Sequence, residues 1–159
     1  DGVRVDQTEE GLDLILQLLR GSTVDFQGDH YTASGAQVAP GPVQQPNPPL
    51  WFGTKSRRMM ELTARYGDVW IPTEIEPDEY RRGMERLRSL RAEMEVSGDI
   101  LGALQNFKVC TDAEAYLATI KEYADAGCCY YGQVWLYPPD EMVQRIKWFG
   151  REVMPHASW

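Results

Sequence analysis

PPLWFGTKSRRMMELTARYGDVWIP, residues 48–72, contains the pattern that decides the fold of this chain. A short continuous apolar run ends at Gly53, a basic stretch follows, and a helical pattern then leads to a second apolar run. Short apolar runs of this kind are typical of strands buried on both faces of a parallel sheet. The stretch therefore predicts strands at 50–53 and 68–72, joined by a helix at 56–67.

The loop after Gly53 has two interpretations. The first N–H groups of the next helix have no partners inside it, and Lys55, Arg57 and Arg58 add positive charge. Such a terminus suits a phosphate or carboxylate, to which Ser56 can also donate its hydroxyl. In the other interpretation Ser56 only caps the helix and the cations are surface residues. Spacing alone favours the cap, because the loop is neither a Walker motif nor a GxGxxG fingerprint.

The alternation of strand and helix continues to the end of the chain. Further strands are predicted at 100–110 and 130–139, and helices at 76–98, 111–127 and 139–156. Thr111 and Glu114 form a capping box at the start of one of these helices. The side chains expected to face the core are Trp51, Trp70 and Trp135 on strands and Met59, Leu62, Tyr66, Tyr80, Met84, Leu87 and Leu90 or Arg91 on helices. In the alternative interpretation, one of the tryptophans forms part of a pocket for a planar cofactor at a strand end.

The first 47 residues have a different organisation. Thr8 is predicted to cap a helix that ends at Gly21, with Leu12, Ile15, Leu16 and Leu19 on one face. Two short alternating runs around Gly28 predict a β-hairpin. Five prolines between 40 and 49 then predict an irregular surface connection.

Strands that alternate with helices of this length indicate an α/β fold with βαβ units and a parallel sheet. In such sheets ligands bind at the carboxyl ends of the strands, where loops lead into helices. The loops at 53–58, 72–76, 110–112 and 137–140 are therefore expected to share one edge of the sheet, and a site is expected there.

Composition argues against several classes of function. The chain has 159 residues, 43% of them hydrophobic, and a formal net charge of −8, which disfavours a nucleic-acid or acidic-membrane partner. No apolar run approaches the roughly 20 residues of a membrane span. Three cysteines without regular spacing favour reduced thiols and a cytoplasmic location over a disulfide framework, and no metal site is expected. The chain lacks an initiator Met, which suggests a processed, trimmed or partial chain.

Other candidate residues have weaker patterns. Glu74 and Glu76 follow a strand and could act as acid or base, but acidic residues are also common at helix N-termini. His30 lies in the hairpin without a nucleophile or carboxylate pattern around it. The adjacent Cys128 and Cys129 are more typical of packing than of a redox pair, because a vicinal disulfide is strained.

Four stretches, in order, resemble the C-terminal half of bacterial luciferase-like oxidoreductases, which are flavin- and F420-dependent TIM barrels. They are EEGLDLILQLLRGSTVDFQGDHY, GAQVAPGPVQQPNPPLWFGTKSRRMMELTARYGDVWIP, TDAEAYLATIKEYADAGCCYYGQVWLYPP and IKWFGREVMPH. The chain departs from the family pattern at Arg57, where many relatives have proline, and at Val69, where many have glycine. It also lacks the helical segment that relatives usually insert between the seventh and eighth strands.

The resemblance implies a cofactor, F420 or alternatively FMN, and hydride transfer to or from a small organic substrate. The positions implied to bind the cofactor, mainly its phosphate-bearing tail, are Gly53, Thr54, Lys55, Ser56, Arg57, Arg58 and Thr73. No catalytic residue is implied within this chain, because the family places much of its ring pocket in the N-terminal half. A non-catalytic half-barrel that binds flavin or another anion, an assembly subunit, and an FMN-dependent monooxygenase are the alternatives. With the resemblance included, anion binding becomes the favoured interpretation of the loop.

The pattern contains about four of the eight strands of a (β/α)8 barrel, plus the hairpin excursion. We expect residues 1–159 to form one domain, with the helix, hairpin and proline-rich connection at 1–47 and the βα units at 48–159. A half-barrel exposes two sheet edges and an apolar inner face, and such edges invite pairing. The expected partner is a second copy in a homo-oligomer or a separate N-terminal half.

Overall fold

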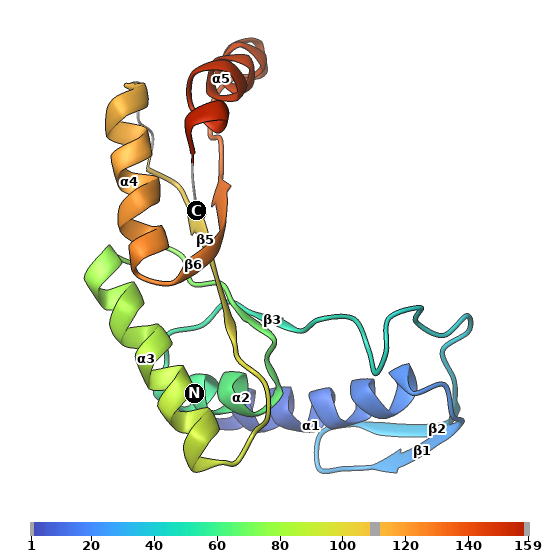
Figure 1. Ribbon diagram of the computed structural model, residues 1–159. Helices are drawn as coiled ribbons and strands as arrows, with labels where there is room; N and C mark the ends of the chain where they lie inside the picture. The colour runs from blue at the N-terminus through green and yellow to red at the C-terminus, as the bar shows by residue number, and fades with distance from the viewer. Residues whose placement is uncertain (1, 109–111, 158–159) are drawn as a thin grey trace. The chain divides into compact units, whose positions relative to one another are not determined.

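The computed structural model describes residues 2–108 and 112–157 (Figure 1). The chain divides into two compact units, Asp1–Leu50 and Trp51–Trp159. This boundary lies close to the predicted change in organisation between residues 47 and 48. That the whole chain forms one domain stays a prediction.

The first unit contains one helix and one hairpin. Helix α1 is Gly2–Leu19, and strands β1 (Val24–Gln27) and β2 (Thr32–Ala36) pair antiparallel, which confirms the predicted hairpin. The predicted start of the helix at Thr8 is wrong, because the Thr8 hydroxyl lies inside the helix and donates to the carbonyl of Arg4, 2.8 Å away. Gly21 has φ +80° and follows the helix, as predicted.

A carboxylate of α1 holds the turn of the hairpin. The two carboxylate oxygens of Glu10 accept hydrogen bonds from the backbone N–H groups of Asp29, His30 and Tyr31, at 2.7–3.0 Å. Gly28 leaves room for this carboxylate, because a Cβ at that position would lie 2.1 Å from a Glu10 carboxylate oxygen and would displace it. Desolvation acts to raise the pKa of Glu10, but the three N–H donors outweigh it and leave the pKa below its ordinary value of 4.5.

The lowered pKa of Glu10 gives a pH dependence to the hairpin turn. A group whose pKa is depressed by folding stabilises the fold above its unfolded pKa and loses that contribution as the pH falls through the folded pKa. We expect the amides of residues 29–31 to be protected from hydrogen exchange near neutral pH and to lose protection at acidic pH below 4.5. Glu10→Gln is expected to weaken this protection at neutral pH and to remove its pH dependence. Exchange measured by NMR checks both, and protection in Glu10→Gln equal to that of the parent chain at neutral pH would contradict them.

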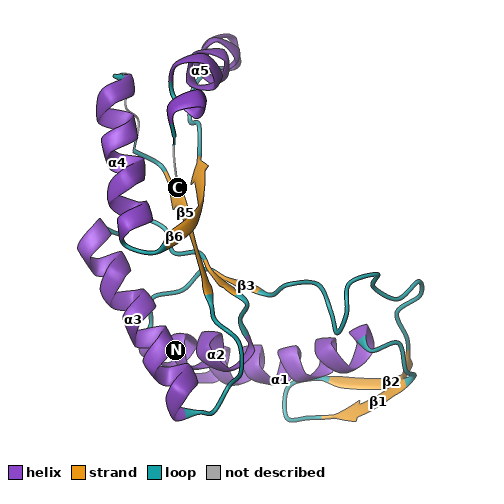
Figure 2. Ribbon diagram, viewed as in Figure 1, coloured by secondary structure: helices purple, strands orange, loops and turns teal. Residues whose placement is uncertain are grey.

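The second unit alternates strands and helices along a parallel sheet (Figures 1 and 2). In chain order its elements are β3 (Trp51–Phe52), α2 (Arg57–Tyr66), β4 (Val69–Trp70), α3 (Pro77–Glu93), β5 (Leu101–Asn106), α4 (Ala113–Asp125), β6 (Cys128–Gln133), α5 (Pro139–Glu152) and the 3₁₀ turn Met154–His156. The strands lie side by side in the order β3-β4-β5-β6, and every neighbouring pair is parallel. The predicted α/β fold with a parallel sheet and a separate hairpin is confirmed.

The core lies between the sheet and helices α2, α3 and α4. Buried side chains of this cluster include Met60, Trp70, Tyr80, Met84, Leu87, Leu90, Ile100, Leu104 and Tyr123. The predicted inner face of α3 is confirmed, whereas α2 buries Met60 instead of Met59. Gly83 and Gly102 allow close approach, because a Cβ at Gly83 would lie 2.2 Å from the Trp70 ring and one at Gly102 would lie 2.3 Å from the Tyr80 hydroxyl.

The opposite face of the sheet is open in the described part of the chain. Trp51 is 48% exposed and Tyr130 is 51% exposed, so the prediction that the strand at 50–53 is buried on both faces is wrong for Trp51. Neighbouring strands lie about 4.8 Å apart, so a flat sheet would place β3 and β6 roughly 14 Å apart. The rings of Trp51 and Tyr130 nevertheless lie 5.6 Å apart, centroid to centroid. Large side chains on a sheet that curves toward this face bring the two rings together, and we call it the concave face.

The last strand is shorter than predicted. It begins at Cys128 and ends at Gln133, where its partner β5 also ends, because the register pairs Asn106 with Gln133. Trp135 therefore lies in the loop after the strand and not on a strand core. Thr111 of the predicted capping box lies outside the described residues, and the carboxylate of Asp112 caps α4 by accepting from the N–H of Ala115 at 2.9 Å.

Candidate functional site: the loop between β3 and α2

The cation-rich loop at 53–58 lies where the sequence predicts, at the carboxyl end of β3 and the N-terminus of α2. Gly53 leaves the strand beside β4, and a Cβ there would lie 3.3 Å from the carbonyl of Ile71. Ser56 is the N-cap residue of α2 in an extended conformation, but its side chain makes no cap hydrogen bond. The bond on which the simple-cap interpretation depends is therefore absent from the described structure, and the hydroxyl remains available to a ligand.

Two side-chain hydrogen bonds fix the loop, one to β4 and one to the loop after β4. The indole N–H of Trp70, a buried residue of β4, donates to the carbonyl of Thr54 at 2.6 Å. The ammonium group of Lys55 donates to the carbonyl of Glu74 at 3.1 Å, which connects this loop to the next one along the sheet. The sequence pattern did not indicate either bond, since a tryptophan on a strand core is ordinarily a packing residue.

The two arginines of the loop begin the helix. Arg57 is its first residue and pairs with Glu61 at 3.3 Å, one helical turn later, with a side chain that is 89% exposed. Arg58 follows it on the surface. An α-helix leaves the N–H groups of its first turn without partners inside the helix, and its dipole makes that end positive. Lys55, Ser56 and Arg57 therefore surround a helix terminus with the chemistry of an anion site.

Thr73 lies on the extension of the neighbouring strand. It forms an isolated parallel bridge with Gln105 of β5 and is partly buried. The structure links the loop at 53–58 to the loop after β4 through Glu74, and no bond joins Thr73 to the loop in the described residues. Glu74 itself has φ +49°, a left-handed backbone that is uncommon for residues other than glycine and is found most often at turns and functional sites.

A second polar group lies at the carboxyl ends of β5 and β6. The buried amide of Asn106 donates to the carboxamide oxygen of Gln133 at 3.0 Å and to the Tyr131 hydroxyl, and Tyr116 of α4 donates to the same Gln133 oxygen. None of these residues belongs to a motif that the sequence indicates as a site. Their signal is a polar side chain at the end of each of two neighbouring strands.

The two acidic candidates, Glu74 and Glu76, differ in their side-chain partners. Glu76 is the N-cap residue of α3 and pairs with Lys108 at 2.5 Å, across a pocket of about 350 Å³. The phenol of Tyr123, whose hydroxyl donates to the carbonyl of Ile75, lines the same pocket. Burial is the main cause that raises the pKa of Tyr123 to about 12, so this phenol stays protonated at neutral pH. These contacts assign Glu76 an ion pair with Lys108, and among the described residues the Glu74 carboxylate has no acid–base partner.

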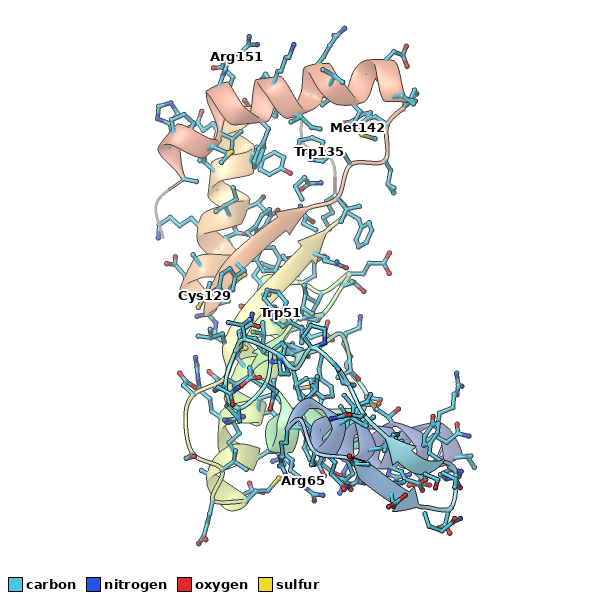
Figure 3. The ribbon with its side chains drawn as sticks, turned by 90° about the vertical axis from the view of Figure 1, so that its right-hand side faces the viewer. Trp51, Arg65, Cys129, Trp135, Met142 and Arg151 are labelled. Atoms are coloured by element: carbon cyan, nitrogen blue, oxygen red, sulfur yellow. The ribbon has the colours of Figure 1, made fainter. Side chains whose placement is uncertain are left out.

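The cysteines do not form a redox pair in the described structure. Cys128 is buried and Cys129 is exposed, and both are free thiols. Figure 3 labels the exposed Cys129. Burial raises the pKa of the Cys128 thiol to about 11, which makes it a weak nucleophile at neutral pH. Cys110 lies outside the described residues. Among the residues that are described, no group of three metal-ligating side chains converges, and no helix is long and apolar enough to cross a membrane.

A curved parallel sheet with helices on one face, and with the cation-rich loop at the carboxyl ends of the strands, defines a segment of a (β/α)8-barrel protein. A family model agrees with that class. Residues 2–150 match the model of the luciferase-like monooxygenase family, and the chain belongs to this family.

Solved structures show the same fold at low sequence identity. An F420-dependent secondary alcohol dehydrogenase, in complex with an F420–acetone adduct, matches 83% of this chain with a TM-score of 0.74 and 16% identity. The coenzyme F420-dependent tetrahydromethanopterin reductase from Methanopyrus kandleri matches 97% of it with a TM-score of 0.69 and 13% identity. A riboflavin lyase with modified FMN and its substrate riboflavin matches 77%, with a TM-score of 0.57 and 14% identity. The matched regions span 56%, 63% and 32% of those three chains.

Proposed function

We propose that this chain contributes the phosphate-binding loop of a luciferase-like oxidoreductase that transfers hydride between coenzyme F420 and a small organic substrate. The observation that carries the proposal is the loop at 53–58. It combines a helix N-terminus, a Ser56 hydroxyl that makes no cap hydrogen bond, and the cations Lys55 and Arg57 at the carboxyl end of a barrel strand. Two neighbours of the same fold are F420-dependent enzymes, which supports F420 over FMN.

The residues present fit the anionic end of such a cofactor. Backbone N–H groups and the hydroxyl of Ser56 supply hydrogen-bond donors, while Lys55 and Arg57 supply charge. Trp70 holds the Thr54 carbonyl, so the loop is fixed before a ligand arrives and loses little freedom on binding. When bound, the cofactor supplies the hydride chemistry, and the protein supplies binding, orientation and exclusion of water. Thr73 and Gln105 lie on neighbouring strands and would face the part of the ligand nearer to the concave face.

The second candidate function is a non-catalytic half-barrel that acts as an assembly subunit. The exposed face of the sheet favours this candidate. The described sheet has four strands, and its concave face leaves Trp51, Leu101 and Tyr130 exposed. We propose that further strands, from a second copy or from an N-terminal half, cover this face and pair with the open edges of β3 and β6. Sedimentation velocity on the purified chain tests the homo-oligomer. If the chain is a monomer at all protein concentrations, a separate N-terminal half is the remaining candidate partner.

Titration with cofactors tests the proposed function. We expect the purified chain to quench the fluorescence of F420, and the double variant Lys55→Gln/Arg57→Gln to weaken F420 binding by about tenfold or more, which corresponds to about 1.4 kcal/mol. Riboflavin, which lacks the phosphate of FMN, is expected to bind more weakly than FMN for the same reason. Lys121→Gln is the charge control, because Lys121 lies on α4 and pairs there with Asp125.

The outcomes separate the candidates. Binding that depends on Lys55 and Arg57, followed by reduction of the bound cofactor with a small alcohol or another organic donor, would support the oxidoreductase. Binding without turnover favours the non-catalytic module, and consumption of oxygen with reduced FMN favours the monooxygenase. If neither cofactor binds, or if the double variant binds as tightly as the parent chain, the loop is not a phosphate site.

A further inference from the structure

A groove on the helical side of the sheet lies between α2 and α3 and begins at the cation-rich loop. It has a volume of about 330 Å³, and its floor is made by the buried side chains of Met60, Trp70, Ile75 and Leu90. Lys55 and Arg57 line the end of the groove nearest the loop, and its other wall is formed by Glu79, Arg82, Gly83 and Arg86 of α3. No motif in the sequence indicates this groove.

The rim of the groove is positive although the chain as a whole is acidic. Four cations line it, Lys55, Arg57, Arg82 and Arg86, against two carboxylates, Glu61 and Glu79, in a protein with a formal net charge of −8. The existing ion pairs use only part of this capacity, because a guanidinium has five N–H donors. Within the described part of the chain, the Arg57 guanidinium contacts Glu61 at 3.3 Å and the Arg86 guanidinium contacts Glu93 at 3.6 Å. Local excess charge of this kind favours an anionic ligand.

The loop at 53–58 lies between this groove and the concave face. Trp51, on β3 just before the loop, lines a pocket of about 430 Å³ on the concave face together with Ile71 and Tyr130. Lys55 and Arg57, a few residues later, line the groove on the helical side. A ligand whose phosphate rests on this loop therefore has a pocket on one side and a charged groove on the other.

We propose that the groove between α2 and α3 binds an oligocarboxylate extension of the cofactor tail beyond the phosphate, as found in the glutamate residues of coenzyme F420. This inference rests on the proposed function. The rim arginines match carboxylate groups, and the apolar floor matches the methylene stems between them. FMN ends at its phosphate and would leave the groove empty, so the groove also selects F420 over FMN.

Cofactors that differ only in tail length test the inference. The probes are F420 with several glutamates, the same compound without glutamate, and the deazaflavin without its phosphate, each titrated by fluorescence anisotropy. We expect the glutamate-bearing form to bind about tenfold tighter than the glutamate-free form. We expect Arg82→Gln/Arg86→Gln to remove that advantage without changing the affinity for the glutamate-free form. Glu79→Gln, which removes a rim carboxylate, is expected to strengthen binding of the glutamate-bearing form only.

Arg88→Gln is the matched control on the same helix. Arg88 pairs with Asp99 at 3.4 Å and does not line the groove, so its loss is expected to leave both affinities unchanged. Equal affinity of the parent chain for the glutamate-bearing and glutamate-free forms would overturn the groove while leaving the phosphate loop intact. An equal loss of affinity for the glutamate-bearing and glutamate-free forms in Arg82→Gln/Arg86→Gln would also overturn the proposed role of the groove. Failure of every phosphate-bearing form to bind overturns the proposed function and the groove together.

Discussion

Replacement of Trp70 by alanine is expected to lower the free energy of unfolding by about 3–5 kcal/mol, the range seen when a large buried aromatic side chain is truncated. The Trp70 side chain is 1% exposed and lies 5.2 Å from the ring of Tyr80, centroid to centroid. Its truncation leaves a cavity under α3, where Gly83 packs directly on the indole. Urea denaturation followed by circular dichroism measures the change.

Trp70 also connects stability to the candidate site. Trp70→Phe keeps most of the packing but removes the N–H that donates to the Thr54 carbonyl. This variant is expected to unfold with a smaller loss than Trp70→Ala, while the amides of the loop exchange faster with solvent and F420 binds more weakly. Trp51→Ala is the control of the same residue type on the neighbouring strand, and its half-exposed side chain should cost about 1 kcal/mol or less. A Trp70→Ala cost as small as that of Trp51→Ala would contradict the assigned core.

Replacement of Arg91 by methionine is expected to lower the free energy of unfolding by about 2–5 kcal/mol, because each buried carbonyl that loses its donor costs about 1–3 kcal/mol. The guanidinium of Arg91 is buried and donates to the carbonyls of Ala64 and Gly67 at the end of α2, at 3.2 and 2.9 Å. It also donates to Ser97 and Gly98 at 2.9 and 3.1 Å. Arg91 thus joins α2 to the loop after α3 and stabilises the negative end of the α2 dipole.

Two variants separate these roles of Arg91. Arg91→Lys retains the positive charge but has a single donor head in place of the planar fork, so it should recover only part of the loss. Arg88→Met removes an exposed arginine of the same helix, whose surface pair with Asp99 is worth about 0–1 kcal/mol. Urea denaturation followed by tryptophan fluorescence reports on all three, because every tryptophan lies in the second unit. Equal losses for Arg91→Met and Arg88→Met would refute the role assigned to the buried guanidinium.

The sequence predicted the elements that depend on local periodicity. Tyr80, Met84, Leu87 and Leu90 recur at helical spacing, and the structure buries them as that spacing requires. The position of the loop at 53–58 also followed from sequence, because an apolar run, a glycine and a helical pattern in succession admit few other arrangements. The start of α1 was wrong, since Thr8 has the residue type of a cap but can equally bond back to Arg4 inside a helix.

The remaining errors came from contacts between residues distant in sequence. Trp51 and Trp70 have the same residue type in similar apolar runs, yet one is half exposed on the concave face and the other is buried under α3. Periodicity does not distinguish them, because burial depends on which face of the sheet is covered. The end of β6 is set in the same way, by the last residue of its partner strand.

Sequence by itself determined the family, the strand–helix order and the place of the cation-rich loop, because each of these depends on residues that are neighbours in the chain. Only the tertiary structure decided that the Ser56 side chain makes no cap hydrogen bond and that Trp70 and Lys55 fix the loop. It also decided that four cations from α2, α3 and the loop surround one groove. The fixed loop and the groove require packing of one element against another, and the Trp70–Thr54 and Lys55–Glu74 bonds join groups that lie 16 and 19 residues apart in the chain. Local propensity contains no information about such distances.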